Sequence, residues 1–241
     1  MNFIKDIYNK NAKGYAQNHE ERFYWFELSK KTVAEYINTN AVDIVVDIGC
    51  GSGTLINYFA SLNNQIRFIG IDYSEELIKI ARSKNKNKNV EFIEADFIND
   101  GIAIIGKLDI HHKKILLLAM GPFEYYNQQD IFTQIILKIW GSVRKGALIC
   151  TFHNQELFGR AIINNKSKEY WKANEALKLF GKEDNNVFKI RYFSFIGSDI
   201  IANKISLFDR PLLYLDYILS TKMPPVISKK IFANFELLVY R

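Results

Sequence analysis

The sequence predicts an α/β fold in which a doubly wound, mostly parallel sheet is covered by helices on both faces. Short apolar runs alternate with amphipathic segments of helical length, such as Glu75–Arg82 and Asp130–Trp140, and this alternation is typical of right-handed βαβ units. A strand that is apolar throughout is expected in a sheet buried on both sides. The runs that we interpret as strands are Ile44–Ile48, Ile66–Ile71, Val90–Ile93, Ile115–Met120 and Ala147–Phe152.

The 241 residues suit one large domain with three successive parts. Residues 1–40 have a helical pattern and are expected to form an N-terminal lid. Residues 41–154 form the predicted ligand-binding core. Residues 155–241 are expected to supply an inserted substrate cap and the strands that complete the same domain.

Individual elements of the C-terminal part are also predicted. Gln155–Phe180 is interpreted as a helix, and Asp199–Ile205 as a short helix. Val187–Phe195 alternates as a strand does, and Phe235–Tyr240 is predicted to be the final strand.

The most informative motif is a glycine-rich turn directly after the first predicted strand. Gly49, Gly51 and Gly53 occupy alternate positions, and apolar residues then resume at helical spacing. Glycine suits a sharp turn and lets the backbone approach a ligand with no Cβ in between. Amide groups at the start of the following helix face the same place. The motif therefore predicts a nucleotide-like ligand beyond the end of the strand.

Acidic residues stand where the first three predicted strands end, at Asp47, Asp72 and Asp96. Ligands of open α/β sheets bind outside the carboxyl ends of the strands, where these side chains converge. Asp72 follows Gly53 by 19 residues, which is about the separation expected for a carboxylate that accepts both ribose hydroxyls. Each acid alone could be a helix N-cap, but three of them behind one glycine turn favour a shared ligand site.

The glycine spacing also distinguishes between classes of nucleotide. A dinucleotide fingerprint has the form G-x-G-x-x-G, whereas here the third glycine comes one residue early. Asp47 is a poor neighbour for a pyrophosphate and a good one for an ammonium group. The lysine pattern of a P-loop is absent. A nucleoside with a cationic tail fits best.

These residues resemble the class I S-adenosylmethionine-dependent methyltransferases, in particular the small-molecule type, over roughly residues 42–154 and more weakly to the final strand. The resemblance implies a Rossmann-like, seven-stranded sheet with an antiparallel final strand. It also implies S-adenosyl-L-methionine as cofactor and S-adenosyl-L-homocysteine as product.

The same resemblance implies the cofactor contacts. Asp47 and the turn from Gly49 through Cys50 and Gly51 to Gly53 would hold the methionine part. Asp72 would hold the ribose hydroxyls. Tyr73 would pack on adenine, and Asp96 would accept from the adenine amino group near the Phe97 amide. The carbonyls of Ala119 or Met120 could contact the ammonium group of the methionine part.

Catalytic and acceptor-binding residues are less strongly indicated. His153 is either a general base or a polar residue at a strand end, and Tyr15 either covers the cofactor or packs in the lid. Glu124, Tyr125 and Tyr126 follow the fourth strand directly and are candidates for the acceptor pocket. Tyr24 and Trp25 either line that pocket or anchor the N-terminal helices. No metal-ligand cluster is apparent in the sequence, so no metal is predicted.

Composition limits the partners and the compartment. The net charge is +6, but the lysines are scattered and do not alternate with aromatic residues as a base-stacking surface requires, so a nucleic-acid partner is not expected. No run of about 18 apolar residues occurs, and the first residues carry no secretion signal. With two separate cysteines, a cytoplasmic protein without membrane association is expected. Nothing in the sequence indicates an oligomeric state.

The predicted function is therefore transfer of a methyl group to an oxygen or nitrogen of a small molecule by in-line displacement. A sulfonium is already a good leaving group, so positioning is the main task, and a base is needed only for an acceptor proton of high pKa. The alternatives are an RNA or protein methyltransferase and a non-catalytic module that binds the cofactor.

Overall fold

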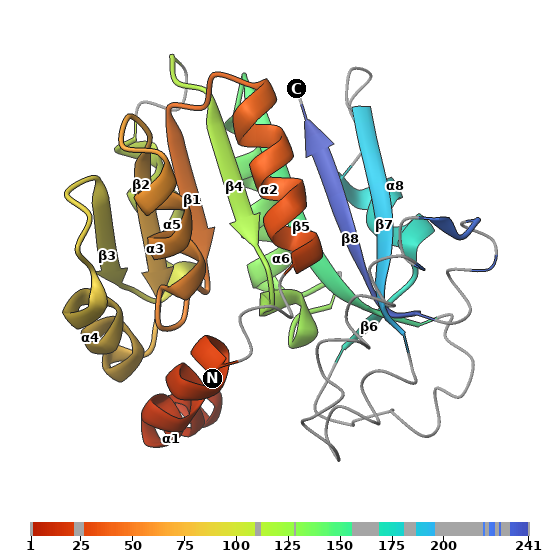
Figure 1. The fold of residues 1–241 in the computed structure, drawn as a ribbon. Helices are drawn as coiled ribbons and strands as arrows, with labels where there is room; N and C mark the ends of the chain where they lie inside the picture. Colours follow the sequence, from red (N-terminus) through yellow and green to blue (C-terminus); the bar gives the residue numbers. More distant parts are fainter. Residues whose placement is uncertain are drawn as a thin grey trace.

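The computed structural model describes residues 2–21, 27–108, 112–127, 129–155, 169–180, 187–195, 219, 222–224, 227 and 232–240. One sheet with the order β3-β2-β1-β4-β5-β8-β7 crosses this part of the chain, and the short β6 pairs beside β5 (Figure 1). The strands are β1 Ile44–Ile48, β2 Arg67–Asp72, β3 Val90–Glu94, β4 Ile115–Ala119, β5 Gly146–Asn154, β6 Tyr170–Trp171, β7 Val187–Phe195 and β8 Phe232–Tyr240.

Strands β1 to β5 are mutually parallel, whereas β8 is antiparallel to both β5 and β7. The predicted parallel sheet with an antiparallel final strand is thus confirmed, with the two-residue β6 as an addition. After β3 the chain returns to the other side of β1, so the strand order reverses between β1 and β4. Ligands of such sheets bind at this reversal, outside the carboxyl ends of the strands.

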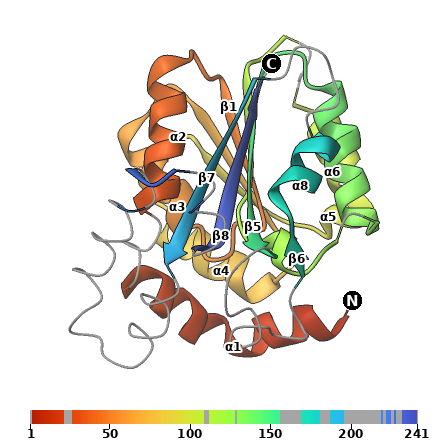
Figure 2. The same cartoon turned by 90° about the vertical axis from the view of Figure 1, so that its right-hand side faces the viewer.

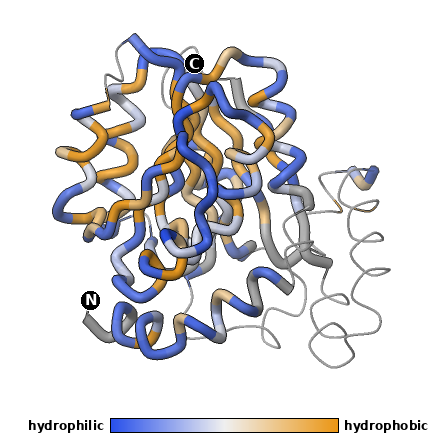
Figure 3. The backbone as a smooth tube through the Cα atoms, turned by 60° about the vertical axis from the view of Figure 1, so that its left-hand side comes forward, coloured by the Kyte–Doolittle hydropathy of each residue, from blue (hydrophilic) through white to orange (hydrophobic). Residues whose placement is uncertain are grey.

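Helices cover both faces of the sheet (Figure 2). On one face, α2 (Glu27–Thr39), α3 (Thr54–Leu62) and α4 (Glu75–Lys84) pack on one apolar cluster. On the other, α5 (Phe97–Gly106), α6 (Ile131–Ser142) and α8 (Ala173–Phe180) pack on a second. The strands form the apolar centre of the molecule in Figure 3, because parallel strands covered on both faces must be hydrophobic on both sides.

Helix α1 (Asn2–Glu21) lies across the end of the sheet toward which the parallel strands point (Figures 1 and 2). It rests on α4, where the Ser74 hydroxyl donates to Asn9 Oδ1 over 2.6 Å and Lys84 pairs with Glu20 at 2.6 Å. Its contacts with α4 thus include a hydrogen bond and an ion pair, whereas α2 packs on the core through apolar side chains. The two helices of the predicted lid differ accordingly: α1 covers strand ends, and α2 belongs to a layer of the core.

The predicted helix over Gln155–Phe180 is confirmed at Ala173–Phe180 and wrong at Tyr170 and Trp171. Tyr170 and Trp171 form a strand beside His153 and Asn154, the Gln155 amide donates to the Trp171 carbonyl over 2.8 Å, and the helix begins only at Ala173. The free edge of β5 and the burial of Trp171, which is 1% exposed, outweigh the local helical pattern. The predicted helix Asp199–Ile205 lies outside the described residues.

Within the part of the chain that is described, no helix combines the length and the apolar character needed to cross a bilayer.

Candidate functional site

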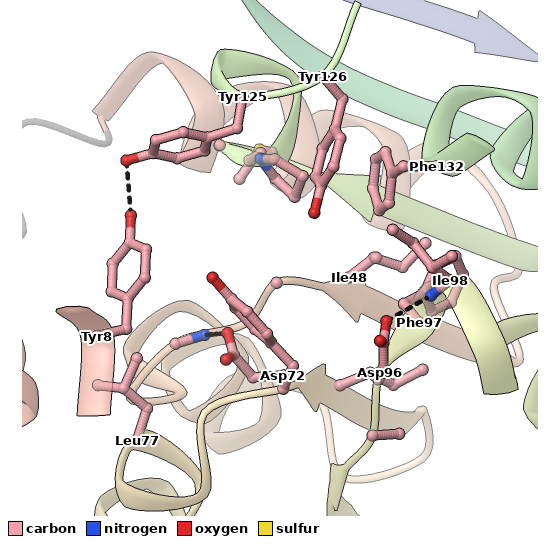
Figure 4. A pocket seen from close by; sticks show the side chains of 18 of the residues that line it. Tyr8, Ile48, Asp72, Leu77, Asp96, Phe97, Ile98, Tyr125, Tyr126 and Phe132 are labelled. Carbon is pink, nitrogen blue, oxygen red and sulfur yellow. Dashed lines mark hydrogen bonds between the residues drawn. The ribbon is translucent and has the colours of Figure 1, made fainter. Parts of the chain in front are cut away.

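A cavity of about 360 Å³ lies at the strand ends beneath α1 (Figure 4). Its walls come from the N-terminal helix, the glycine turn, the ends of β2 and β3 and the segment after β4. The lining residues are Tyr8, Tyr15, Ile48, Gly49, Gly51, Ile71, Asp72, Tyr73, Leu77, Ala95, Asp96, Phe97, Ile98, Met120, Gly121, Pro122, Tyr125, Tyr126 and Phe132.

The glycine turn forms the floor of this cavity and is bound to the end of β2. The amides of Gly49 and Cys50 both donate to the Ile71 carbonyl, over 2.8 and 3.1 Å. Gly51 has a φ of 55°, which an L side chain rarely adopts, and an added Cβ would lie 3.2 Å from Cε1 of Tyr15. A bare backbone at Gly51 therefore keeps open the space between the turn and Tyr15.

Gly53, the third glycine of the turn, packs against β3 and α4. Its φ is 72°, and a Cβ there would lie 2.5 Å from Cζ of Phe92 on β3 and 3.1 Å from Cβ of Ala81 on α4. It is not among the described residues that line the cavity. Gly53 thus allows α3 to approach the sheet and α4 closely.

Asp72 is the central acid of the site. It is 6% exposed, its Oδ2 accepts from the Gly51 amide and its Oδ1 from the Ser74 amide, both over 2.9 Å. Burial raises its pKa, while these backbone donors lower it. A carboxylate has about four acceptor positions. Asp72 therefore holds the turn through two hydrogen bonds and can still accept hydrogen bonds from a ligand in the cavity.

Asp96 and Phe97 form the opposite end of the cavity. Asp96 caps α5 by accepting from the Ile98 amide over 3.0 Å, and Phe97 is the first residue of that helix. Tyr73 also lines the cavity, and burial together with the nearby Asp72 raises the pKa of its phenol. Asp96 is therefore a helix N-cap that also lines the cavity.

Asp47 and Cys50 lie behind the turn. Asp47 is 4% exposed, and burial, with a contribution from Asp72, raises its pKa to about 7. The Cys50 sulfur faces β2, where a Cβ on Gly70 would lie 2.8 Å from it, and burial raises the pKa of this thiol. Neither residue lines the described cavity, so any effect of these side chains on a ligand passes through the turn.

Tyrosines close the side of the cavity beneath α1. The Tyr8 hydroxyl lies 2.9 Å from that of Tyr125, which joins α1 to the segment after β4 (Figure 4). The Tyr8 ring also packs edge-on against Tyr15, with 5.2 Å between centroids. Tyr8 was not predicted, although it precedes Tyr15 by two helical turns and so shares its face.

The other candidates are distributed as follows. Met120 and Tyr126 line the cavity, whereas Ala119 is fully buried in β4. His153 pairs with Asn234 and Tyr170 within the sheet and is not one of the described lining residues. The side chain of Glu124 and both Tyr24 and Trp25 lie outside what the structure describes. Phe132 and Ile98, which sequence reasoning missed, come from two helices brought together only by the fold.

The charges of the lining favour a cationic ligand. Its described members include Asp72 and Asp96 and no lysine, arginine or histidine. A cavity that is acidic, partly aromatic and floored by bare backbone at Gly51 fits a nucleoside with a positively charged tail, because opposite charge and aromatic faces both stabilise a cation. A phosphate group would meet two carboxylates.

Comparison with known proteins agrees with this geometry. Residues 40–191 match the family model described as a methyltransferase domain. The chain is 26% identical over 186 residues to ribosomal RNA small subunit methyltransferase A of Mesomycoplasma hyopneumoniae (strain J), covering 76% of this chain and 65% of that relative. It is 37% identical over 179 residues to a tRNA (guanine-N(7)-)-methyltransferase of Clostridium botulinum (strain Hall), covering 72% and 71% of the two chains.

A solved structure has a similar fold. Magnesium protoporphyrin IX methyltransferase from Synechocystis PCC 6803, with bound S-adenosylhomocysteine, superposes with a TM-score of 0.61 at 14% identity, over 100% of this chain and 99% of that one.

Proposed function

Because the chain belongs to the methyltransferase domain family, matched over residues 40–191, we propose that it binds S-adenosylmethionine in the cavity above the glycine turn and transfers the methyl group to a small molecule. The observation that carries the proposal is the acidic cavity between Asp72 and Asp96, open over Gly51 and without a basic side chain among its described lining residues. The acceptor atom is an oxygen or nitrogen.

When bound, S-adenosylmethionine supplies a methyl group activated by a sulfonium. Asp72 would hold the ribose hydroxyls with the acceptor positions that Gly51 and Ser74 leave, and Asp96 would accept from the adenine amino group beside Phe97. The glycine turn and Met120 would face the methionine part. A cationic methionine part would favour the ionised form of Asp47 behind the turn, whose pKa burial raises to about 7 in its absence.

The protein must also align the methyl donor with the acceptor and exclude water from the cavity. Tyr8, Tyr15 and Tyr125 form a continuous aromatic wall beneath α1, which separates the cavity from solvent on that side. Holding donor and acceptor in line contributes about 7–11 kcal/mol to such reactions. An acceptor of low pKa needs no base; for one of high pKa, we propose Tyr15, which lines the cavity.

The surface beside the cavity favours a small acceptor over a nucleic acid. Three of the five lysines on α1 and α4 are paired with acids: Lys5 with Glu94, Lys79 with Glu75 and Glu76, and Lys84 with Glu20, whereas Lys10 and Lys13 of α1 are exposed and make no ion pair with the described residues. Lysines that are already paired have less to gain from phosphates, whose binding depends on releasing counterions. RNA remains the second candidate, because the relatives from Mesomycoplasma and Clostridium are named for RNA substrates.

A transfer assay with methyl-labelled S-adenosylmethionine tests the proposal. The protein is incubated separately with a panel of small phenols, amines and carboxylic acids, with total RNA and with total protein, and Asp72→Asn serves as the inactive control. Label in a small acceptor supports the proposal. Label in RNA that declines steeply with added salt supports the second candidate, and binding with no transfer to any class would identify a non-catalytic module.

A further inference from the structure

We propose that Trp171 is a positioning residue for the cofactor, which it serves by holding the Tyr126 wall of the cavity in place. Trp171 belongs to the segment inserted after β5, which the sequence assigns only to the acceptor. This inference rests on the proposed function, since it concerns the same cavity.

The indole of Trp171 is fixed at both ends. Its backbone is anchored by pairing with Asn154 at the end of β5 and by the Gln155 amide, which donates to its carbonyl over 2.8 Å. Its ring is 1% exposed and lies 5.0 Å from the Phe152 ring and 5.7 Å from the Phe123 ring between centroids. Because both the backbone and the ring of Trp171 are held in place, its indole N–H points in a fixed direction.

That N–H donates to the backbone carbonyl of Tyr126 over 3.1 Å, although the two residues are 45 positions apart. Tyr126 lies in the irregular segment between β4 and α6, where no helix or strand holds its backbone. A hydrogen bond from a buried, immobile donor therefore restrains this segment at the point where it borders the cavity.

Tyr126 transmits the restraint to the ligand site. Its ring stacks on Phe132 with 4.5 Å between centroids and 17° between planes. Both rings face the end of the cavity formed by Asp96 and Phe97 (Figure 4), the end that we assign to adenine. Displacing the Tyr126 backbone would therefore move the aromatic wall opposite the adenine-binding acid.

The positioning role can be separated from packing because only the N–H bonds to Tyr126. Trp171→Phe keeps an aromatic ring in the core and removes the donor. The matched control is Phe180→Leu, since Phe180 packs on the same Phe123 and Phe152, at 5.7 and 6.2 Å between centroids, and does not line the cavity. Both variants lower stability, and only the first releases Tyr126.

The test is a double-mutant cycle on the affinity for S-adenosylhomocysteine, measured by titration calorimetry. Loss of one neutral hydrogen bond predicts about 3- to 10-fold weaker binding of S-adenosylhomocysteine by Trp171→Phe. The affinity of Phe180→Leu should be unchanged. Adding Trp171→Phe to Tyr126→Ala should cause almost no further loss of affinity. An equal loss in both backgrounds, or unchanged affinity of Trp171→Phe, would overturn the inference while leaving the proposed function intact.

A second readout needs no ligand. Amide hydrogen exchange in residues 123–132 is expected to accelerate in Trp171→Phe and to stay at the wild-type rate in Phe180→Leu. Unchanged exchange in Trp171→Phe would overturn the inference even if wild type binds the ligand. Failure of wild type to bind S-adenosylhomocysteine would instead overturn the proposed function.

Discussion

Replacing Gly53 with alanine is expected to lower the free energy of unfolding by about 2–5 kcal/mol. Two effects add to this figure. An L residue with φ near 72° is strained by about 1–2 kcal/mol. The new methyl group would also lie 2.5 Å from Phe92 Cζ and 3.1 Å from Ala81 Cβ, and overpacking of this kind costs about 1–3 kcal/mol.

Urea unfolding followed by circular dichroism measures this loss, with Gly51→Ala as the matched control. Gly51 has a similar φ of 55°, but its Cβ would meet only Tyr15, at 3.2 Å. Gly51→Ala should therefore lose about 1–2 kcal/mol and should weaken ligand binding, whereas Gly53→Ala should lose more stability. A Gly53→Ala protein as stable as Gly51→Ala would refute the packing role assigned to Gly53.

Three further changes test other parts of the structure. Burial raises the pKa of Asp47 to about 7 from 3.8, so wild type loses stability relative to Asp47→Asn as the pH rises between these values, by about 1.4 kcal/mol per pH unit in urea unfolding. Tyr8→Phe removes the hydroxyl bonded to Tyr125, and the amides of α1 should then exchange about 2–10 times faster with deuterium. Thr32→Val removes the donor 2.6 Å from Oε1 of the buried Glu236 and should lower the free energy of unfolding by about 1–3 kcal/mol.

Each of these predictions has a contradicting outcome. If the difference in free energy of unfolding between wild type and Asp47→Asn does not vary with pH, Asp47 ionises as freely in the folded protein as in the unfolded chain. Wild-type exchange in Tyr8→Phe would show that the hydroxyl pair does not hold α1. For Thr32→Val the control is Thr39→Val, because Thr39 is exposed and its hydroxyl bonds only to Glu35, Tyr36 and the adjacent Asn40 among the described residues. Equal losses in both variants would contradict a role for Glu236.

The strands and the position of the site followed from local sequence patterns. Ile44–Ile48 and Val187–Phe195 became strands with the predicted bounds. The first is a mostly apolar run, as burial on both faces requires, and the second alternates between apolar and polar residues, which is typical of a strand. The glycine turn and the acids at the ends of β2 and β3 could also be predicted, because turns and strand ends depend on residues that are neighbours in the sequence.

Directions of side chains around the turn could not be predicted in the same way. Cys50 and Gly53 are in the motif but face β2 and β3, and Asp47 lies behind the turn. Which side each residue faces depends on the successive positive φ angles at Gly49, Gly51 and Gly53, and no local pattern reports them.

Contacts distant in sequence were missed for a related reason. Strand β6 forms because β5 has a free edge near Trp171, and the bond from Trp171 to Tyr126 spans 45 residues. Both depend on the assembled sheet, whereas the sequence near Trp171 shows only a helical pattern.

The most direct test of the central claim is the affinity of wild type, Asp72→Asn and Asp100→Asn for S-adenosylmethionine by titration calorimetry. Asp100 is an exposed acid in the first turn of α5 that does not line the cavity. Losing one charge-assisted hydrogen bond predicts about 10- to 100-fold weaker binding for Asp72→Asn, with Asp100→Asn unchanged. Wild-type affinity in a folded Asp72→Asn protein would contradict the claim that this cavity holds the methyl donor.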